Sequence, residues 1–272
     1  MTPFATVVRY AIQESVRRRV FLVVLVLSAS FVAVYTAGAA AIFGGLSDFD
    51  PGGGEHAAAG AGLLGFAMFV VLFLGTTLAI FLTIGTVRGD AERGLLQPLL
   101  VRPLGRTRLL AARLTAAAGM SSAYVVAFFL LLVVLTASVG QWVPDSLPGA
   151  TLGLVGAVLV VCLLSLLGST FLSSTANGIA VFMLFGAGLG GALLHQLAIG
   201  LDSSALKGVS ELAGWLLPFM ALYLSALGSL GPDIDTADIL GGPSGLALVL
   251  WTLFYLGLLA VGARTIFLSR DL

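Results

Sequence analysis

Long apolar runs separated by short polar clusters dominate the chain. Six runs contain no Asp, Glu, Lys or Arg, and they cover approximately residues 20–43, 62–87, 114–140, 150–172, 178–200 and 245–263. Each is close to or longer than the roughly 20 residues that a helix needs to cross the hydrocarbon core of a bilayer. Because the runs show no two-residue alternation, they predict helices and not barrel strands. The pattern therefore predicts an all-α integral membrane protein with six transmembrane helices.

An amphipathic helix is predicted ahead of the first run. Apolar side chains recur at helical spacing from Phe4 to Val16, and Arg17 to Arg19 follow them. This pattern is typical of a helix that lies along the inner membrane surface with its arginines at anionic headgroups. Residues 1–19 are thus interpreted as an interfacial helix, although a simple positively charged anchor fits equally well.

The apolar stretch from Gly214 to Leu230 is a seventh candidate for a span. It is short and contains Pro218, and a span there would place Arg264 and Arg270 on the opposite side from the other arginines. We therefore expect a helix that lies in, or dips into, the outer leaflet.

The charged residues set the predicted orientation. Only 10% of the residues are charged, 59% are hydrophobic, and the net charge is zero. If the helices alternate in direction, twelve of the thirteen Lys and Arg residues share one side, and only Lys207 lies opposite. The positive-inside rule then predicts a multi-pass cell-membrane protein with both termini in the cytoplasm. Residues 20–272 form the transmembrane domain, with a cytoplasmic loop at 88–113 and an outer segment at 201–244.

The loop after the second run is more than a connector. A charged cluster at its start leads into a short apolar stretch, Leu95 to Val101, and Pro103 and Gly105 then interrupt the chain between arginines. About twenty-five residues exceed what a simple connection requires. An amphipathic helix with charged ends is suited to a groove on a partner protein, so this loop is the predicted docking element.

At these residues the chain resembles the ABC type-2 permease family, the membrane subunits of ATP-driven exporters, and particularly the branch associated with multicopper enzyme maturation. That family carries an acidic pair, Gly-Thr-Leu, a Leu-Leu-x-x-Pro-x-x-Arg stretch, and Gly-Lys before the third span. The matching residues here are Asp90, Glu92, Gly94, Leu99, Leu100, Pro103 and Arg106. Leu95 replaces the usual threonine, and Ala112-Arg113 replaces Gly-Lys.

The resemblance implies a permease subunit that couples ATP hydrolysis by a separate ATPase subunit to substrate export. The region 88–106 would then carry the coupling helix that docks on that ATPase. The residues implied in coupling are Asp90, Glu92, Arg93, Gly94, Leu95, Leu96, Leu99, Leu100, Arg102, Pro103 and Arg106. The family also implies a second permease chain, identical or related. ATP and Mg would bind to the partner ATPase, and no nucleic-acid partner is expected.

The arginines of this loop have a second interpretation. Arg102, Arg106 and Arg108 also fit ordinary positive-inside residues. Asp90 and Glu92 fit that interpretation less well, because acidic residues are scarce on the predicted cytoplasmic side.

Several chemical activities are disfavoured by the residues present. A Walker A loop needs a lysine followed by Ser or Thr, whereas Lys207 is the only lysine and precedes Gly208. The chain is therefore not expected to be an enzyme or to bind a cofactor. The apolar runs contain no Asp, Glu, Lys or Arg, the buried ionisable residues that an ion-coupled carrier normally uses, and Ser165 and Ser169 have no histidine at a matching depth for an intramembrane protease.

The histidines are interpreted as structural, and no metal site is predicted. His195, near the outer end of the fifth run, is expected to pack or to lie at the interface. His56 accompanies Asp48, Asp50 and Glu55 in a Gly-rich outer segment. That segment is interpreted as a solvated loop in preference to a cation site.

Gly186 and Gly190 form a GxxxG pattern within the fifth run. Small residues allow helices in lipid to approach closely, and the pattern is interpreted as packing within the chain in preference to dimerisation. The alternative to an export permease is a non-transporting membrane scaffold or channel subunit, because the same spans would suffice for either.

Overall fold

The structure is a computed structural model, and it describes residues 8–13, 19–46, 54–84, 106–231 and 242–269. The described residues are helical apart from short turns, and residues 8–13 form one helical stretch within the predicted interfacial helix. The longer helices are α2 (Arg19–Leu46), α3 (Gly54–Thr83), α5 (Arg106–Gly140), α6 (Leu147–Ser169), α7 (Ser174–Gly200), α8 (Ser204–Leu216), α9 (Pro218–Gly228) and α10 (Gly245–Ser269).

Six of these helices are long and apolar enough to cross a membrane: α2, α3, α5, α6, α7 and α10. The predicted all-α fold with six transmembrane helices is thus confirmed. The helix ends differ from the apolar runs, since α3 begins at Gly54 and α5 at Arg106. Residues 106–113, predicted as loop, are therefore helical. The run marks only the part of a helix that matches lipid, and a helix continues beyond it wherever its backbone remains hydrogen-bonded.

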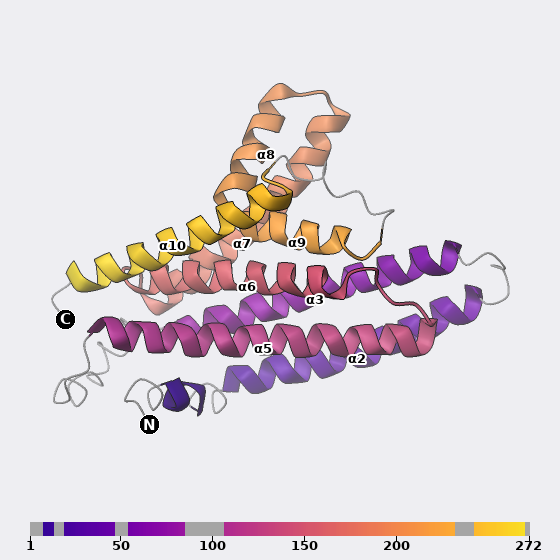
Figure 1. The fold of residues 1–272 in the computed structure, drawn as a ribbon, viewed down its shortest axis with the longest axis horizontal. Helices are drawn as coiled ribbons and strands as arrows, with labels where there is room; N and C mark the ends of the chain where they lie inside the picture. Colours follow the sequence, from indigo (N-terminus) through magenta and orange to yellow (C-terminus); the bar gives the residue numbers. More distant parts are fainter. Residues whose placement is uncertain (1–7, 14–18, 47–53, 85–105, 232–241, 270–272) are drawn as a thin grey trace.

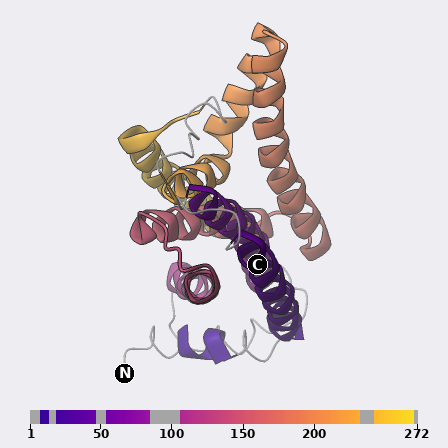
Figure 2. The same ribbon diagram turned by 90° about the vertical axis from the view of Figure 1, so that its right-hand side faces the viewer.

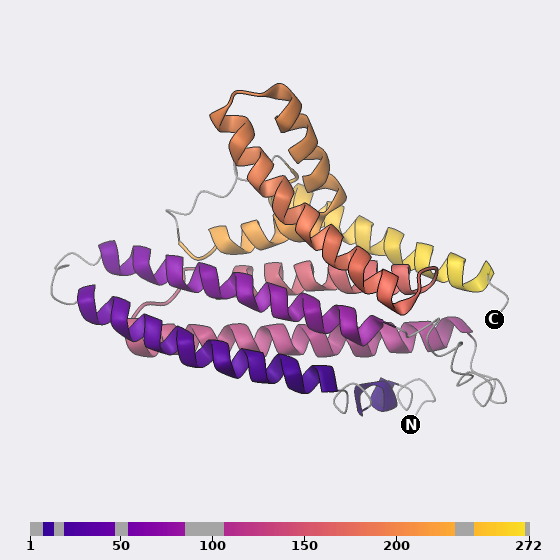
Figure 3. The same ribbon diagram turned by 180° about the vertical axis from the view of Figure 1, so that it is seen from behind.

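The helices α2, α3, α5 and α6 lie side by side, and α9 and α10 pack along α6 (Figure 1). The hairpin of α7 and α8 projects from this group, as the end-on and reverse views also show (Figures 2 and 3). We call the end of the bundle at which α2, α5 and α7 begin the inner end, following the orientation predicted from the arginines. The opposite end is the outer end.

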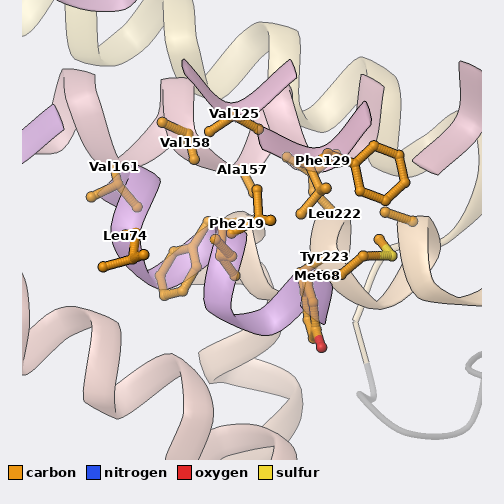
Figure 4. Close-up of a cluster of buried hydrophobic side chains, with 14 of the residues drawn as sticks. Met68, Leu74, Val125, Phe129, Ala157, Val158, Val161, Phe219, Leu222 and Tyr223 are labelled. Atoms are coloured by element: carbon orange, nitrogen blue, oxygen red, sulfur yellow. The ribbon is translucent and has the colours of Figure 1, made fainter. Parts of the chain in front are cut away.

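The helix α3 is the central element of the bundle. In the apolar part of α3 67% of the residues are buried within the protein, against 17% in α2. Side chains from α3, α5, α6 and α9 meet in one core, which includes Met68, Phe129, Val158 and Phe219 (Figure 4). At Gly75 of α3, an added Cβ would lie 2.5 Å from Val125 Cγ2. The three helices α3, α5 and α6 are therefore in direct contact at the centre of the bundle.

The outer segment is more deeply buried than the sequence predicts. Where one helix was expected over Gly214–Leu230, the structure has a break at Leu217, and α8 and α9 meet there at a bend of 92°. Pro218 starts α9 and has no N–H to continue the hydrogen bonding of α8. The residues Pro218 to Leu224 are all buried. The pair α8 and α9 is thus a bent element that enters the bundle, and α9 does not lie on its surface.

A close backbone approach holds α9 against α6. An added Cβ at Gly153 of α6 would lie 2.6 Å from Ala226 Cβ and 2.8 Å from the Leu222 carbonyl oxygen. Small residues at such a crossing increase van der Waals contact between helices in lipid. Gly153 therefore explains how α9 lies so close to α6.

Candidate functional site at the inner ends of α3, α6 and α7

The predicted coupling residues lie almost entirely outside the described residues. This applies to Asp90, Glu92, Arg93, Gly94, Leu95, Leu96, Leu99, Leu100, Arg102 and Pro103. Arg106 is the first residue of α5. The structure does place the two helices that bound this segment, because α3 ends and α5 begins at the inner end (Figure 1). The residues around the end of α3 are therefore described residues that directly border this loop.

Three polar side chains from three helices meet at this point. The Thr83 hydroxyl of α3 lies 2.7 Å from Ser165 Oγ of α6, within hydrogen-bond distance, and it also lies 2.8 Å from the Ala79 carbonyl oxygen of its own helix. Asn177 Nδ2 of α7 lies 2.9 Å from the Ser165 carbonyl oxygen and 3.3 Å from Ser165 Oγ, and it donates to both. All three side chains are fully buried. We call this cluster, Thr83, Ser165 and Asn177, the inner junction.

The turn between α6 and α7 positions Asn177. Helix α6 ends at Ser169, and Ser173 caps the start of α7, where its side chain accepts a hydrogen bond from the Ala176 N–H. The short connection turns the chain back, so that the first turns of α7 lie against the last turns of α6. Asn177 thereby faces the Ser165 backbone, twelve residues earlier in the chain.

Gly168 provides the space for the Asn177 amide. A Cβ built at Gly168 would lie in direct conflict with Asn177 Oδ1. The same oxygen is buried and accepts no hydrogen bond from the residues that the structure describes. The Asn177 amide is thus hydrogen-bonded through its nitrogen, whereas its oxygen is packed against Gly168 without a donor.

A groove borders the inner junction. It has a volume of about 620 Å³ and lies between the last residues of α3 and the first half of α7. Its lining consists of Phe81, Ile84, Ser174, Thr175, Gly178, Ile179, Phe182 and Met183. The lining is mostly apolar, so polar contact between α3 and α7 is concentrated at the inner junction.

The sequence did not predict the inner junction. Ser165 was considered only as a protease nucleophile, and the fifth apolar run was drawn from residue 178, one position after Asn177. An asparagine at the edge of an apolar run is a usable signal, because amide side chains in membrane helices commonly bond to neighbouring helices. Asn177 bonds to Ser165, which in turn bonds to Thr83, and no local pattern in the sequence relates these three positions.

Each of the two histidines contacts a neighbouring helix. His195 Nδ1 lies 2.9 Å from Ser210 Oγ of α8. Because that hydroxyl donates to the Lys207 carbonyl, it must accept the hydrogen bond from the N–H at His195 Nδ1. This bond connects α7 to α8. His56 lies in the first turn of α3 and not in a loop, with its ring centroid 5.1 Å from that of Phe43. Asp48 and Asp50 lie outside the described residues.

The interpretation of the GxxxG pattern was wrong for its two glycines. An added Cβ at Gly186 or Gly190 would meet nothing within 4 Å. The glycines that do pack within the chain are their neighbours, Gly188 against the Phe219 ring and Gly191 against Ala213. The glycines of the pattern face outward because α7 turns its opposite side to α8 and α9.

A comparison with models of protein families assigns the chain to a family. The model of the family described as protein of unknown function DUF2705 matches residues 51–207, which run from before α3 into α8 and include the inner junction. No curated protein matches the sequence. Because the family model covers more than half of the chain, the chain belongs to the DUF2705 family.

Proposed function

We propose that the chain is the membrane-spanning permease subunit of an ABC exporter, in which a separate ATPase subunit hydrolyses ATP. We assign the coupling element to the loop between α3 and α5. Two features support this assignment: the motif at residues 90–106, and the position of the two helices on either side of the loop. A multi-span helical membrane protein is compatible with this role.

The observation that carries the proposal is the position of α3. This helix leads into the loop and is the most buried of the six spans. Helix α5, which follows the loop, contacts α3 at Gly75 and Val125. Packed interiors resist local deformation and shift as units. A force applied to the loop would therefore act directly on the centre of the bundle.

The outward face of α7 is the surface we assign to a second permease chain. Its residues alternate in steps of three and four: Ala176, Ile179, Met183, Gly186, Gly190, Leu193 and Leu197. This spacing is that of a helix-packing seam, and the two glycines at its centre allow a close crossing. In a two-fold dimer the same face is used by both copies, and residues at the same depth meet.

Co-purification with an ATPase tests the proposal. The ATPase would be the product of a reading frame adjacent to that of this chain, carrying Walker A and ABC signature motifs. Asp90→Arg with Glu92→Arg should release it while the protein remains inserted, because charge reversal at an exposed loop disturbs docking and not the spans. Glu211→Arg, an exposed reversal on α8, is the control and should retain it. Retention by the loop variant would contradict the coupling assignment, and a complete absence of ATPase would favour a scaffold or channel.

The leucines of the loop should supply most of the docking energy. Leu95→Ala, Leu96→Ala, Leu99→Ala and Leu100→Ala should each weaken ATPase binding by about 1–3 kcal/mol where the leucine fills a groove, because buried apolar anchors dominate interfaces. Deletion of residues 2–12 is the comparison, since the interfacial helix is expected to use its apolar face on lipid. Release by that deletion alone would move the docking element to the N-terminus.

Cysteine cross-linking tests the dimer face. In a Cys162→Ala chain, Gly186→Cys and Gly190→Cys should form disulfides between copies in native membranes. Leu253→Cys, which is 62% exposed on α10, should not. Cross-linking through α10 and not through α7 would place the second chain elsewhere.

A further inference from the structure

We propose that the inner junction transmits displacement from the end of α3 to α7, so that α7 moves when the loop after α3 is displaced. This inference rests on the proposed function only for the source of the displacement. The residues that transmit the displacement are Thr83, Ser165 and Asn177, and Gly168 leaves the space that the Asn177 amide occupies.

The hydrogen bonds of the junction join at one residue. Ser165 is hydrogen-bonded to Thr83 of α3 on one side and accepts from Asn177 of α7 on the other. Thr83 is the last residue of α3, and Asn177 lies in the first turn of α7. A shift of the α3 end must therefore break the bond to Ser165 or carry Ser165 and Asn177 with it.

The environment of the junction favours the second outcome. All three side chains are shielded from solvent, and the junction lies near the inner ends of three spans. Thr83 can still donate to the Ala79 or Ile80 carbonyl of its own helix if it leaves Ser165, whereas the Asn177 amide has no water there to replace Ser165. The three groups are thus more stable when they move together than when they separate.

Room for movement exists on one side of α7. The groove beside the junction separates Phe81 of α3, and Ile84 just after α3, from Ile179, Phe182 and Met183 of α7. Helix α7 therefore has a polar attachment at Asn177 and an open, apolar side next to it. Beside Phe182 and Met183 the groove leaves α7 room to move relative to α3, whereas at Gly178 the two segments are already close, since an added Cβ there would lie 3.1 Å from Ile84 Cδ1.

The side-chain oxygen of Asn177, which has no hydrogen-bond donor, would allow a second arrangement of the junction in which a hydroxyl bonds to it. Asn177 Oδ1 is buried without a donor and faces the bare backbone of Gly168. A buried acceptor without a donor is unfavourable. A rearrangement that brings a hydroxyl to this oxygen therefore gains a hydrogen bond, which offsets part of the free-energy cost of the rearrangement. A device that switches between two arrangements needs two states that are close in free energy.

Spin-label distances measure the transmission. Labels at Leu253→Cys on α10 and Leu184→Cys on α7, which are 62% and 39% exposed in the native chain, would be introduced into a Cys162→Ala chain, because α10 contributes no residue to the junction and Leu184 lies outside the face assigned to the second chain. The labelled chain is diluted with unlabelled chain, so that only distances within one copy are read. The permease with its bound ATPase is compared without nucleotide and with a non-hydrolysable ATP analogue. The expected result is a nucleotide-dependent shift of the distance, which is lost in Thr83→Val and in Asn177→Leu.

Two further variants distinguish a loss of the transmitted motion from a loss of the folded structure. Thr83→Ser keeps the hydroxyl and should restore the shift. Tyr35→Phe removes a buried hydroxyl contact between α2 and α5, Tyr35 to Thr136, away from the junction, and it should leave the shift unchanged. Melting curves identify any variant that has unfolded.

The outcomes distinguish this inference from the proposed function. A nucleotide-dependent shift that persists in Thr83→Val and Asn177→Leu overturns the inference, as does a native complex that binds the analogue without moving α7. In both cases the permease assignment stands. A chain that binds no ATPase overturns both.

Discussion

At the scale of single residues, the amide of Asn177 is the least satisfied group in the inner junction. Its nitrogen makes two hydrogen bonds to Ser165, whereas its buried oxygen faces Gly168 without a donor. Leaving a buried acceptor unpaired costs roughly 1–3 kcal/mol. Its nitrogen nevertheless joins α7 to α6, and the absence of a side chain at position 168 leaves room for the amide.

Substitution of Gly168 tests this packing. Gly168→Ala should lower the free energy of unfolding by about 1–3 kcal/mol, because the new methyl group forces Asn177 out of its position. Gly119→Ala on α5 is the matched control, since a Cβ there meets nothing within 4 Å and should raise stability by about 0.5–1 kcal/mol. Thermal unfolding in detergent measures both. Equal melting temperatures for the two variants would contradict the close approach at Gly168.

At the scale of elements, α2 depends on a few polar contacts for its attachment. Only 17% of its apolar part is buried. Ser28 Oγ lies 2.6 Å from Tyr124 OH, and Tyr35 OH lies 2.5 Å from Thr136 Oγ1. Because Ser28 donates to the Val24 carbonyl, Tyr124 is the donor of the first pair. Two hydroxyl pairs, at different depths, thus fix α2 in register against α5.

A double-mutant cycle measures the first of these pairs. Tyr124→Phe and Ser28→Ala should show a coupling energy of roughly 0.6 kcal/mol and not more than about 1.7 kcal/mol, the range found for hydrogen bonds between membrane helices. Ser138→Ala replaces Ser28→Ala in the control cycle, because Ser138 bonds only to the Leu135 carbonyl of its own helix. Unfolding in mixed micelles supplies the free energies. Additivity within about 0.3 kcal/mol would show that the Ser28 to Tyr124 contact contributes nothing.

At the scale of the whole molecule, the bent pair of α8 and α9 changes the outline of the bundle without changing its predicted orientation. Helix α8 returns from the outer end of α7, and α9 enters beside α6 (Figures 1 and 3). Trp251 of α10 donates its indole N–H to the Trp215 carbonyl near the end of α8, over 2.9 Å. This bond satisfies a carbonyl that the break before Pro218 would otherwise leave free.

Labelling from each side of the membrane tests the orientation. In a Cys162→Ala chain, Ser203→Cys and Ser244→Cys should react with an impermeant maleimide from outside the cell, because α8 and α9 together enter and leave on the outer side. Thr107→Cys, in the first turn of α5, should react only from the cytoplasm. If Ser203→Cys or Ser244→Cys reacts only from the cytoplasm, the six-span topology is wrong.

The candidate site illustrates the limit of sequence reasoning here. The coupling motif could be identified locally, since its residues are contiguous, but the structure does not describe them. The inner junction could not be identified in the same way, because Thr83, Ser165 and Asn177 are far apart in the chain. The apolar helices contain many buried hydroxyl groups. The rotation of each helix about its axis decides which of these groups contact one another. Helical periodicity alone leaves that rotation open when a helix is apolar on every side.

The sequence by itself determined the fold class and the number of spans. The bilayer imposes a requirement on each segment separately, namely about 20 apolar residues with internally satisfied backbone, so composition within a window is sufficient. Only the tertiary structure decided which face of each helix is buried. Gly188 and Gly191 pack within the chain while Gly186 and Gly190 face outward, and α9 enters the bundle although it is too short to span. These outcomes depend on shape complementarity between distant segments, and in lipid no difference in hydrophobicity marks the packed face in advance.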